Sequence, residues 1–168
     1  MTGDNRDRPQ MPHGYGVPEA IEGMLSWDEV EARLVASEQY WMATTREDGR
    51  PHVVPRWGVW IDGKLFYDGS PETVHVKNLK RNPACTLHLE DGWQAVVVEG
   101  ESGPTASPGI DLGKRIASAM SGKYGPKGYS PEPDSWEGPE AGGLCCFIPS
   151  KALAWFDFPN DVTRFDLT

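Results

Sequence analysis

One segment of the chain, residues 67–78, combines hydroxyl, amide and basic side chains where an apolar strand gives way to a helix. Gly69-Ser70-Pro71 marks that boundary, because serine caps helices and proline suits the first helical position. The unpaired N–H groups of a helix start favour an anion. The segment is therefore a candidate phosphate site of a cofactor, formed by Tyr67, Asp68, Gly69, Ser70, Thr73, His75, Lys77 and Asn78, with Arg56 as a further positive charge.

The same residues are also compatible with an ordinary capped helix. Glu72 lies in the expected first turn, where its carboxylate would satisfy the helix dipole without any ligand. The spacing alone does not decide between these two interpretations.

A second candidate is the run Pro55, Arg56, Trp57 and Gly58 in the middle of a predicted strand. Proline has no N–H and glycine has no side chain, so the backbone here is open to a flat heteroaromatic ring. The alternative interpretation is an edge strand that contains a β-bulge.

Metal chemistry and side-chain nucleophiles find little support in the sequence. The four histidines lack zinc-site spacing, and there is no Cys-x-x-Cys or Gly-x-Ser-x-Gly motif. Cys145 and Cys146 are adjacent in a predicted strand, so their thiols face opposite ways and do not form a redox pair. We therefore predict no metal site, and we assign no catalytic side chain.

Composition excludes several function classes. The chain has 168 residues and a net charge of −9, which argues against a nucleic-acid partner. It contains no 18-residue apolar run and begins with a polar segment, so neither a membrane span nor a secretion signal is expected. Three cysteines do not make a disulfide framework, and a reducing, cytoplasmic location is predicted.

The elements that must position these residues are mainly strands. Residues 1–22 form a Pro- and Gly-rich irregular arm, and residues 23–168 form one domain. A capping box of Ser26 and Glu29 starts the first helix, and further helices are expected at 70–82 and 107–125. Strands are expected at 40–45, 52–60, 64–67, 84–90, 93–101, 144–148 and 152–157. The Pro-rich stretch 125–143 is long enough to be either mobile or functional.

Several short motifs follow one another in a recognisable order. They are Tyr40-Trp41-Met42-Ala43-Thr44-Thr45, Asp48-Gly49-Arg50-Pro51-His52-Val53-Val54-Pro55, Trp60-Ile61-Asp62-Gly63-Lys64-Leu65-Phe66-Tyr67, Lys77-Asn78-Leu79, Asn82-Pro83, Leu87-His88-Leu89, Val98-Glu99-Gly100, Ala154-Trp155-Phe156, Phe158-Pro159 and Thr163-Arg164-Phe165. Over residues 26–168 this order resembles the pyridoxamine 5′-phosphate oxidase-like superfamily. The closer resemblance is to its branch of flavin- and deazaflavin-dependent oxidoreductases.

The resemblance implies a mainly β protein with helical covers, a six-stranded antiparallel split β-barrel of the FMN-binding type. It implies a homodimer with two sites for FMN or coenzyme F420 at the interface. The ring would lie along residues 55–58 and the phosphate near residues 67–70. The partner subunit would contribute Trp155, and Lys123 or Tyr124. The implied function is hydride transfer between this cofactor and a small planar substrate, with backbone donors near the ring in place of a side-chain base.

The chain departs from that family at the start of the helix. Members that hold FMN tightly carry Ser-Arg-Lys, whereas Thr73-Val74-His75 stands here, so two cations for the phosphate are missing. This favours coenzyme F420 over FMN, and vitamin B6 synthesis is not predicted. The alternatives are a carrier that binds a flavin or deazaflavin without turnover, and a haem-binding barrel that uses His75.

Overall fold

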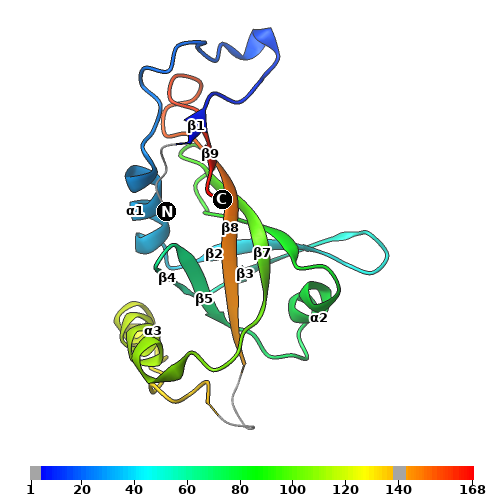
Figure 1. Cartoon of the computed structure of the whole chain (residues 1–168), viewed down its shortest axis with the longest axis vertical. Coiled ribbons are helices and arrows are strands. Elements are labelled where there is room, and N and C mark those ends of the chain that lie inside the picture. Colours follow the sequence, from blue (N-terminus) through cyan, green and yellow to red (C-terminus); the bar gives the residue numbers. More distant parts are fainter. Residues whose placement is uncertain (1–4, 138–142) are drawn as a thin grey trace.

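The computed structural model describes residues 5–137 and 143–168 (Figure 1). Its strands are β1 (Arg6–Asp7), β2 (Tyr40–Thr45), β3 (Pro51–Arg56), β4 (Val59–Ile61), β5 (Lys64–Asp68), β6 (Ala84–His88), β7 (Val96–Pro104), β8 (Leu144–Ala154) and β9 (Thr163–Asp166). Its helices are α1 (Trp27–Ala36), α2 (Val74–Arg81) and α3 (Gly109–Tyr124), with 3₁₀ turns η1 (His13–Tyr15) and η2 (Gly125–Lys127).

All strand pairs are antiparallel and form a split barrel. The order is β1-β9-β8-β7-β6-β2-β3, and the hairpin of β4 and β5 joins through β8. One edge of β8 pairs with β7 throughout, whereas its other edge pairs with β5 over residues 144–147 and with β9 over residues 151–154. The division of this edge between two partners is where the barrel is split.

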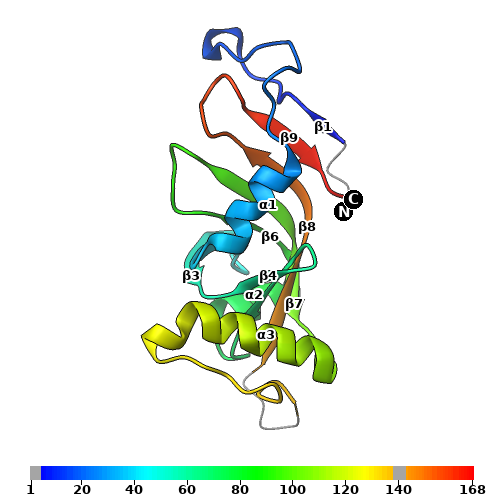
Figure 2. The same cartoon turned by 90° about the vertical axis from the view of Figure 1, so that its left-hand side faces the viewer.

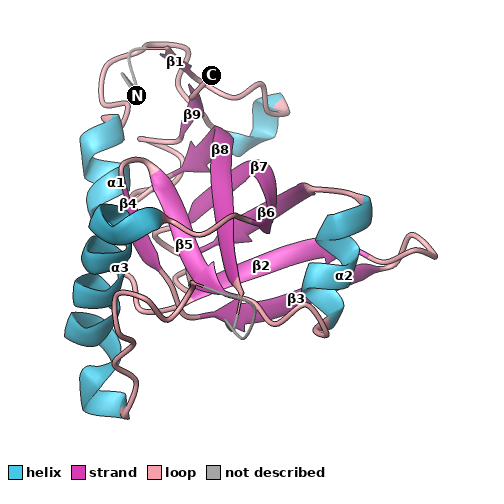
Figure 3. Cartoon of the chain, turned by 60° about the horizontal axis from the view of Figure 1, so that its bottom comes forward, coloured by secondary structure: helices cyan, strands magenta, loops and turns pink. Residues whose placement is uncertain are grey.

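The helices cover different parts of the sheet. The views agree that α1 and α3 lie on the same side of the molecule, where both contact β4 (Figures 1 and 2). Helix α2 lies near the other end of the sheet and contacts β2 and β7 (Figure 3). The mainly β fold with helical covers, predicted from the sequence, is confirmed.

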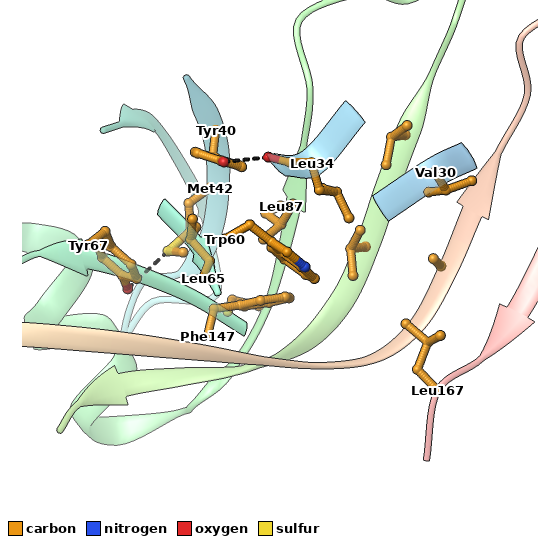
Figure 4. Close-up of a cluster of buried hydrophobic side chains, with 14 of the residues drawn as sticks. Val30, Leu34, Tyr40, Met42, Trp60, Leu65, Tyr67, Leu87, Phe147 and Leu167 are labelled. Carbon is orange, nitrogen blue, oxygen red and sulfur yellow. Dashed lines mark hydrogen bonds between the residues drawn. The ribbon is translucent and has the colours of Figure 1, made fainter. Parts of the chain in front are cut away.

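The barrel encloses an apolar core. Tyr40, Met42, Leu65, Tyr67 and Phe147 are almost fully buried in it (Figure 4). The Tyr40 hydroxyl donates to the Leu34 carbonyl at 2.5 Å, so the end of α1 is fixed to the barrel. A second apolar cluster lies under α3, so this helix closes a core of its own against β4 and β5.

Three predicted strands are divided differently in the structure. The predicted strand 52–60 is two strands, because β3 pairs with β2 whereas β4 pairs with β5, and the chain turns at Trp57-Gly58. The predicted strands 144–148 and 152–157 are one strand, β8, which passes through Pro149 by a bulge. Proline is tolerated at a bulge because the ladder is interrupted there.

Helix starts were predicted with mixed success. Ser26 and Glu29 form the expected capping box of α1. By contrast, α2 begins at Val74 instead of Pro71, because residues 70–73 form a separate turn in which the Thr73 hydroxyl donates to the Ser70 carbonyl at 2.7 Å. Pro108 is the N-cap of α3, one position before the predicted place of a helical proline.

The described parts of both terminal segments contain strands that the sequence did not predict. The last residues contain β9, which was predicted only as a tail, and β1 of the arm pairs with it. Arg8 donates to the carbonyls of Ala20, Glu22, Asn160 and Val162 and so ties the arm to the turn before β9. The boundary between arm and domain at residue 23 stays a prediction.

We expect the close approach of β7 and β8 at the bulge to tolerate only glycine at position 100. A Cβ on Gly100 would lie 2.2 Å from the Ile148 carbonyl oxygen, so Gly100→Ala should lower the free energy of unfolding by about 1–3 kcal/mol in urea titrations. Gly103→Ala on the same strand, where a Cβ meets nothing within 4 Å, is the control and should leave stability nearly unchanged. Equal effects of the two substitutions would contradict this account of the bulge.

Candidate functional site

The free edge of β3 is the first component of the site. The Arg46 N–H donates to the Arg50 carbonyl at 2.9 Å at the hairpin end, which fixes the alternation of the ladder between β2 and β3. His52, Val54 and Arg56 therefore direct their backbone groups to β2, and the odd-numbered residues direct theirs outward.

Two of the three outward residues are Pro51 and Pro55, which have no N–H. Within β3, the outward edge thus presents three carbonyls and only one donor, the Val53 N–H. This edge is a poor template for another strand, but it is open to the polar edge of a flat ligand.

Arg56, at the end of β3, reaches across to the end of β5. Its Nη2 donates to the Asp68 carbonyl, and its guanidinium carbon lies 5.9 Å from the centre of the Tyr67 ring. Its Nε is buried and has no hydrogen-bond partner among the described residues. A buried guanidinium N–H without a partner is unusual in a folded protein.

His75 lies beside it in the first turn of α2 and is only 2% exposed. Its Nε2 is also buried without a partner in the described part of the chain. Burial, together with the positive charge of Arg56 and the proximity of His52, lowers the pKa of His75 to about 4. The imidazole is therefore neutral at pH 7, and its tautomer depends on what it binds.

Gly69 lies next to the imidazole. A Cβ at this position would lie 2.6 Å from Cys145 Sγ and in ordinary contact, at 3.6 Å, with His75 Nε2, so a larger residue would clash with Cys145. We call Arg56, Gly69 and His75 the anion seat. Tyr67 supports it from below: its hydroxyl forms hydrogen bonds with Ser102 Oγ at 2.8 Å and Met42 Sδ at 3.3 Å.

The remaining polar residues of the predicted phosphate site form local hydrogen bonds. Lys77 pairs with Glu72 at 3.1 Å on the surface. Asn78 is buried, and its Nδ2 donates to Thr44 Oγ1 at 3.0 Å, which indicates a structural role. Ser70 and Thr73 bond within their own turn. The structure therefore brings Arg56, Tyr67, Asp68, Gly69 and His75 together. The other four residues of the predicted site, Ser70, Thr73, Lys77 and Asn78, form hydrogen bonds of their own.

Trp57 and Gly58 form the turn after β3. The Trp57 ring is 40% exposed and stacks on Tyr124 with ring centres 4.8 Å apart and planes within 2°. The Gly58 N–H donates to the Tyr124 hydroxyl at 2.9 Å, and a Cβ at Gly58 would lie 2.8 Å from Leu65 Cδ1. The indole is thus held as a fixed flat surface beside the free edge of β3.

Asp68 has partners that the sequence did not reveal. Its carboxylate accepts from Trp136 Nε1 at 2.7 Å and from the Tyr129 hydroxyl. Burial, and the hydrogen bond to this carboxylate, raise the pKa of Tyr129, so it remains a donor at neutral pH. We call residues 125–137 the strap, because both contacts fasten this segment to the end of β5.

The strap is the described part of the Pro-rich stretch 125–143 that the sequence marked as mobile or functional. It also packs against α3, since a Cβ on Gly113 would lie 2.5 Å from the Pro133 carbonyl oxygen. Residues 138–142 of that stretch lie outside the described residues. The high proline content of the sequence marked out this long segment, but no local pattern indicated that it contacts Asp68.

Trp155 does not join these residues within one chain. It lines a separate cavity of about 600 Å³ with Met11, Tyr15, Trp93, Gln94 and Phe158 among others. Trp93 is 89% exposed there. Lys123 is another residue that the resemblance assigned to the site of the partner subunit. Its Nζ donates to the Ser37 carbonyl at 2.6 Å, and burial lowers its pKa to about 8.

Comparison with known proteins identifies the family. The family model described as pyridoxamine 5′-phosphate oxidase matches residues 26–125, which is more than half of the chain. This chain belongs to the pyridoxamine 5′-phosphate oxidase family. The resemblance predicted from the motifs is thereby confirmed. No curated protein sequence matches the chain.

Solved structures with a similar fold confirm the split barrel. An F420 reductase is 21% identical, with a TM-score of 0.55, over 79% of this chain and 98% of its own. A conserved hypothetical protein from Mycobacterium tuberculosis is 20% identical, with a TM-score of 0.63, over 83% and 89%. A FAD-binding protein from Mesorhizobium loti is 19% identical, with a TM-score of 0.57, over 86% and 96%.

Two further observations concern metal binding and membrane insertion. Among the described residues, no three His, Cys, Asp or Glu side chains gather as a metal site would require. None of the helices in residues 5–137 and 143–168 has the length and apolarity needed to cross a membrane.

We expect His75 to make the stability of the protein depend on pH. Its pKa is about 4 in the folded chain and about 6.5 in the unfolded chain, so the unfolded state takes up the proton first as the pH falls. Stability is full above pH 6.5 and is lost towards pH 4. Between pH 7 and pH 5, protonation of His75 should cost the unsubstituted protein about 2 kcal/mol of its free energy of unfolding. His75→Gln should abolish this part of the pH dependence in urea titrations.

His13→Gln, at an exposed position in η1, is the control and should leave that pH dependence as it is. If His75→Gln and the unsubstituted protein lose the same stability on acidification, His75 is not the group that carries the effect.

We expect Trp136 to hold the strap in place. Trp136→Phe keeps the apolar ring but removes the donor to Asp68, which should cost about 1.5 kcal/mol and accelerate amide hydrogen exchange in residues 129–136. Mass spectrometry of peptides from the strap measures this. Trp93→Phe, at an exposed indole, should change neither the stability nor the exchange in the strap. Unchanged exchange in residues 129–136 of Trp136→Phe would contradict the role given to the hydrogen bond between Trp136 and Asp68.

Proposed function

We propose that the chain is an oxidoreductase that binds coenzyme F420 or FMN, with the ring against β3 and the phosphate at the anion seat. The observation that carries this proposal is that Arg56 Nε and His75 Nε2 are buried and have no hydrogen-bond partner among the described residues. Buried polar atoms are nearly always satisfied, and Arg56 is close enough to lower the pKa of His75, so these two exceptions fit a ligand with acceptor oxygens. The residues present therefore fit the anionic part of such a cofactor.

The free edge of β3 suits the ring. The pyrimidine edge of flavins and deazaflavins carries one N–H between two carbonyls; the Val53 N–H could donate to one ring carbonyl, and a β3 carbonyl could accept from the ring N–H. Trp57 would cover one side of the ring, and the strap would limit the access of water. When bound, the cofactor supplies hydride transfer, and the protein supplies position, polarity and shielding.

Coenzyme F420 is favoured over FMN by the charges of this site. Among the described residues, Arg56 is the cation available to the proposed anion seat at neutral pH, because Lys77 is paired with Glu72. The fold is shared with an F420 reductase and with a FAD-binding protein, and this supports a flavin-type cofactor without choosing between them.

We also propose that two copies of the chain assemble around the cofactor. In a single copy, the cavity lined by Trp155 and Trp93 is separate from the anion seat, and its aromatic walls are exposed. A second copy would bring this apolar surface to the ring, as the family resemblance implies. The cytoplasmic location and the absence of a nucleic-acid partner remain predictions from composition.

A haem-binding function is the weaker alternative. The fold is shared with a haem storage protein from Vibrio cholerae, at 18% identity and a TM-score of 0.55 over 73% of this chain and 88% of that one. However, His75 is 2% exposed and lies beside Gly69 and Cys145, so a haem iron with its porphyrin would need far more rearrangement to reach Nε2 than a single phosphate oxygen would.

The test is a fluorescence titration of the cofactor-free protein with FMN and with coenzyme F420. We expect F420 to bind with micromolar affinity, and Arg56→Met to weaken it at least tenfold, because a charge-assisted contact is lost. Arg50→Met, which removes an exposed pair with Asp48, is the control. Binding of neither cofactor would overturn the proposal, and binding without reduction of any quinone or enone acceptor would indicate a carrier.

A further inference from the structure

The cavity that contains Trp155 has walls from three parts of the chain, and none of them belongs to the anion seat. The arm contributes Met11 and Tyr15, the tip of the hairpin between β6 and β7 contributes Trp93, and the segment after β8 contributes Trp155 and Phe158. These three parts lie at the same end of the molecule (Figures 1 and 2). At about 600 Å³, the cavity has room for a small organic ligand.

Aromatic rings meet at steep angles in this cavity. The centre of the Phe158 ring lies 5.6 Å from that of Trp155, with planes 66° apart, and 6.5 Å from that of Tyr15, with planes 87° apart. Rings at such angles do not stack, and Tyr15 and Phe158 remain 56% and 39% exposed. The open face of an aromatic ring carries the negative part of its quadrupole, so this corner attracts a cation.

Trp93 is exposed although its backbone is fixed by the hairpin. Asp91 Oδ1 accepts from the N–H groups of Trp93 and Gln94 at 2.8 Å and 3.1 Å. Next to the tip, the Trp155 N–H donates to the Ala95 carbonyl at 3.0 Å. The Trp93 side chain is nevertheless 89% exposed. A ligand in the cavity would therefore cover a large apolar surface without first having to order the chain.

The wall of the cavity carries negative charge. Among the described residues that line it, Asp157 is the charged one, and its Oδ2 accepts from the neutral Asn160 Nδ2 at 2.9 Å. Behind the wall, Asp161 Oδ2 accepts from the N–H groups of Phe156 and Asp157, both at 2.9 Å. Asp161 Oδ1 is buried without a partner in the described part of the chain. Neither carboxylate forms an ion pair with a described residue.

Two basic side chains approach this end of the molecule, and both are engaged. Arg33 of α1 lies over the ring of Phe156, 3.8 Å from its centre. Arg8 donates to four carbonyls of the arm and of the turn before β9. Neither guanidinium lines the cavity. An anionic ligand would therefore meet a carboxylate on the wall, whereas an organic cation would meet that carboxylate together with aromatic faces.

We infer that this cavity binds an organic cation of the quaternary ammonium class, as a ligand distinct from the cofactor. Quaternary ammonium groups are apolar on their surface and still carry a charge, and aromatic walls recognise both properties. The inference does not rest on the proposed function, because the residues that carry it lie outside the anion seat and outside β3. In the dimer proposed above, this ligand would lie between the aromatic walls and the ring.

Two ligands of the same shape test the inference. The probes are m-hydroxyphenyltrimethylammonium and m-tert-butylphenol, which differ in charge but hardly in size. An NMR titration of the isotopically labelled, cofactor-free protein follows the indole N–H signals of Trp93 and Trp155. We expect the cation to shift both signals and to bind at least tenfold more tightly than the phenol. The signal of Trp136, whose indole is buried in the strap, should stay where it is.

Two variants separate the effect of charge from that of shape. Asp157→Asn removes the carboxylate of the wall, so it should weaken binding of the cation at least threefold and leave the affinity of the phenol unchanged. Trp93→Leu keeps an apolar side chain but removes the indole face, so it should reduce the preference for the cation. Asp111→Asn, at an exposed position in the first turn of α3, is the control and should change the binding of neither probe.

The opposite results would overturn the inference. Equal affinity of the two probes would show a merely apolar cavity, and unchanged binding in Asp157→Asn would remove the carboxylate from the site. Shifts confined to other indoles would place the cation elsewhere. If the signals of Trp93 and Trp155 respond to protein concentration and not to the cation, a second copy fills the cavity instead. The proposed function is tested separately, because this titration contains neither FMN nor coenzyme F420.

Discussion

Strand β8 pairs with β7 along one edge and shares its other edge between β5 and β9. The first four residues of β8 hold β5, so the end of β5 lies against Cys145 and delivers Asp68 and Gly69 to the end of β3. The bulge at Pro149 then lets the same strand continue to β9. The anion seat depends on this arrangement, because its three residues come from β3, α2 and the turn between β5 and α2.

Local signals in the sequence predicted local structure well. The capping box of Ser26 and Glu29 and the end of the second helix near residue 82 each depend on neighbouring residues, and the structure contains both. The strand at 52–60 failed because apolar alternation does not report which strand a segment pairs with. The choice between β2 and β5 as partner, which breaks the segment at Trp57-Gly58, is a tertiary property.

The candidate site shows the same division. Arg56, Gly69 and His75 were found from sequence because glycine and basic residues at a strand end have a local chemical meaning. Their proximity could not be derived, since it requires β3 and β5 to meet. The contacts of Asp68 with Tyr129 and Trp136 span more than 60 residues, and no spacing rule relates them. Likewise, the pairing of Lys77 with Glu72 was not foreseen, although it determines how many cations remain for a ligand.

The arm at the start of the chain has a consequence for how the protein should be handled. Arg8 binds four carbonyls, two in the arm and two in the turn before β9, and Met11 and Tyr15 of the same arm line the cavity that contains Trp155. The wall of that cavity is thus assembled from opposite ends of the polypeptide. A purification tag or a truncation at the amino end would therefore disturb the wall of this cavity, so a carboxy-terminal tag is the safer choice for any binding assay.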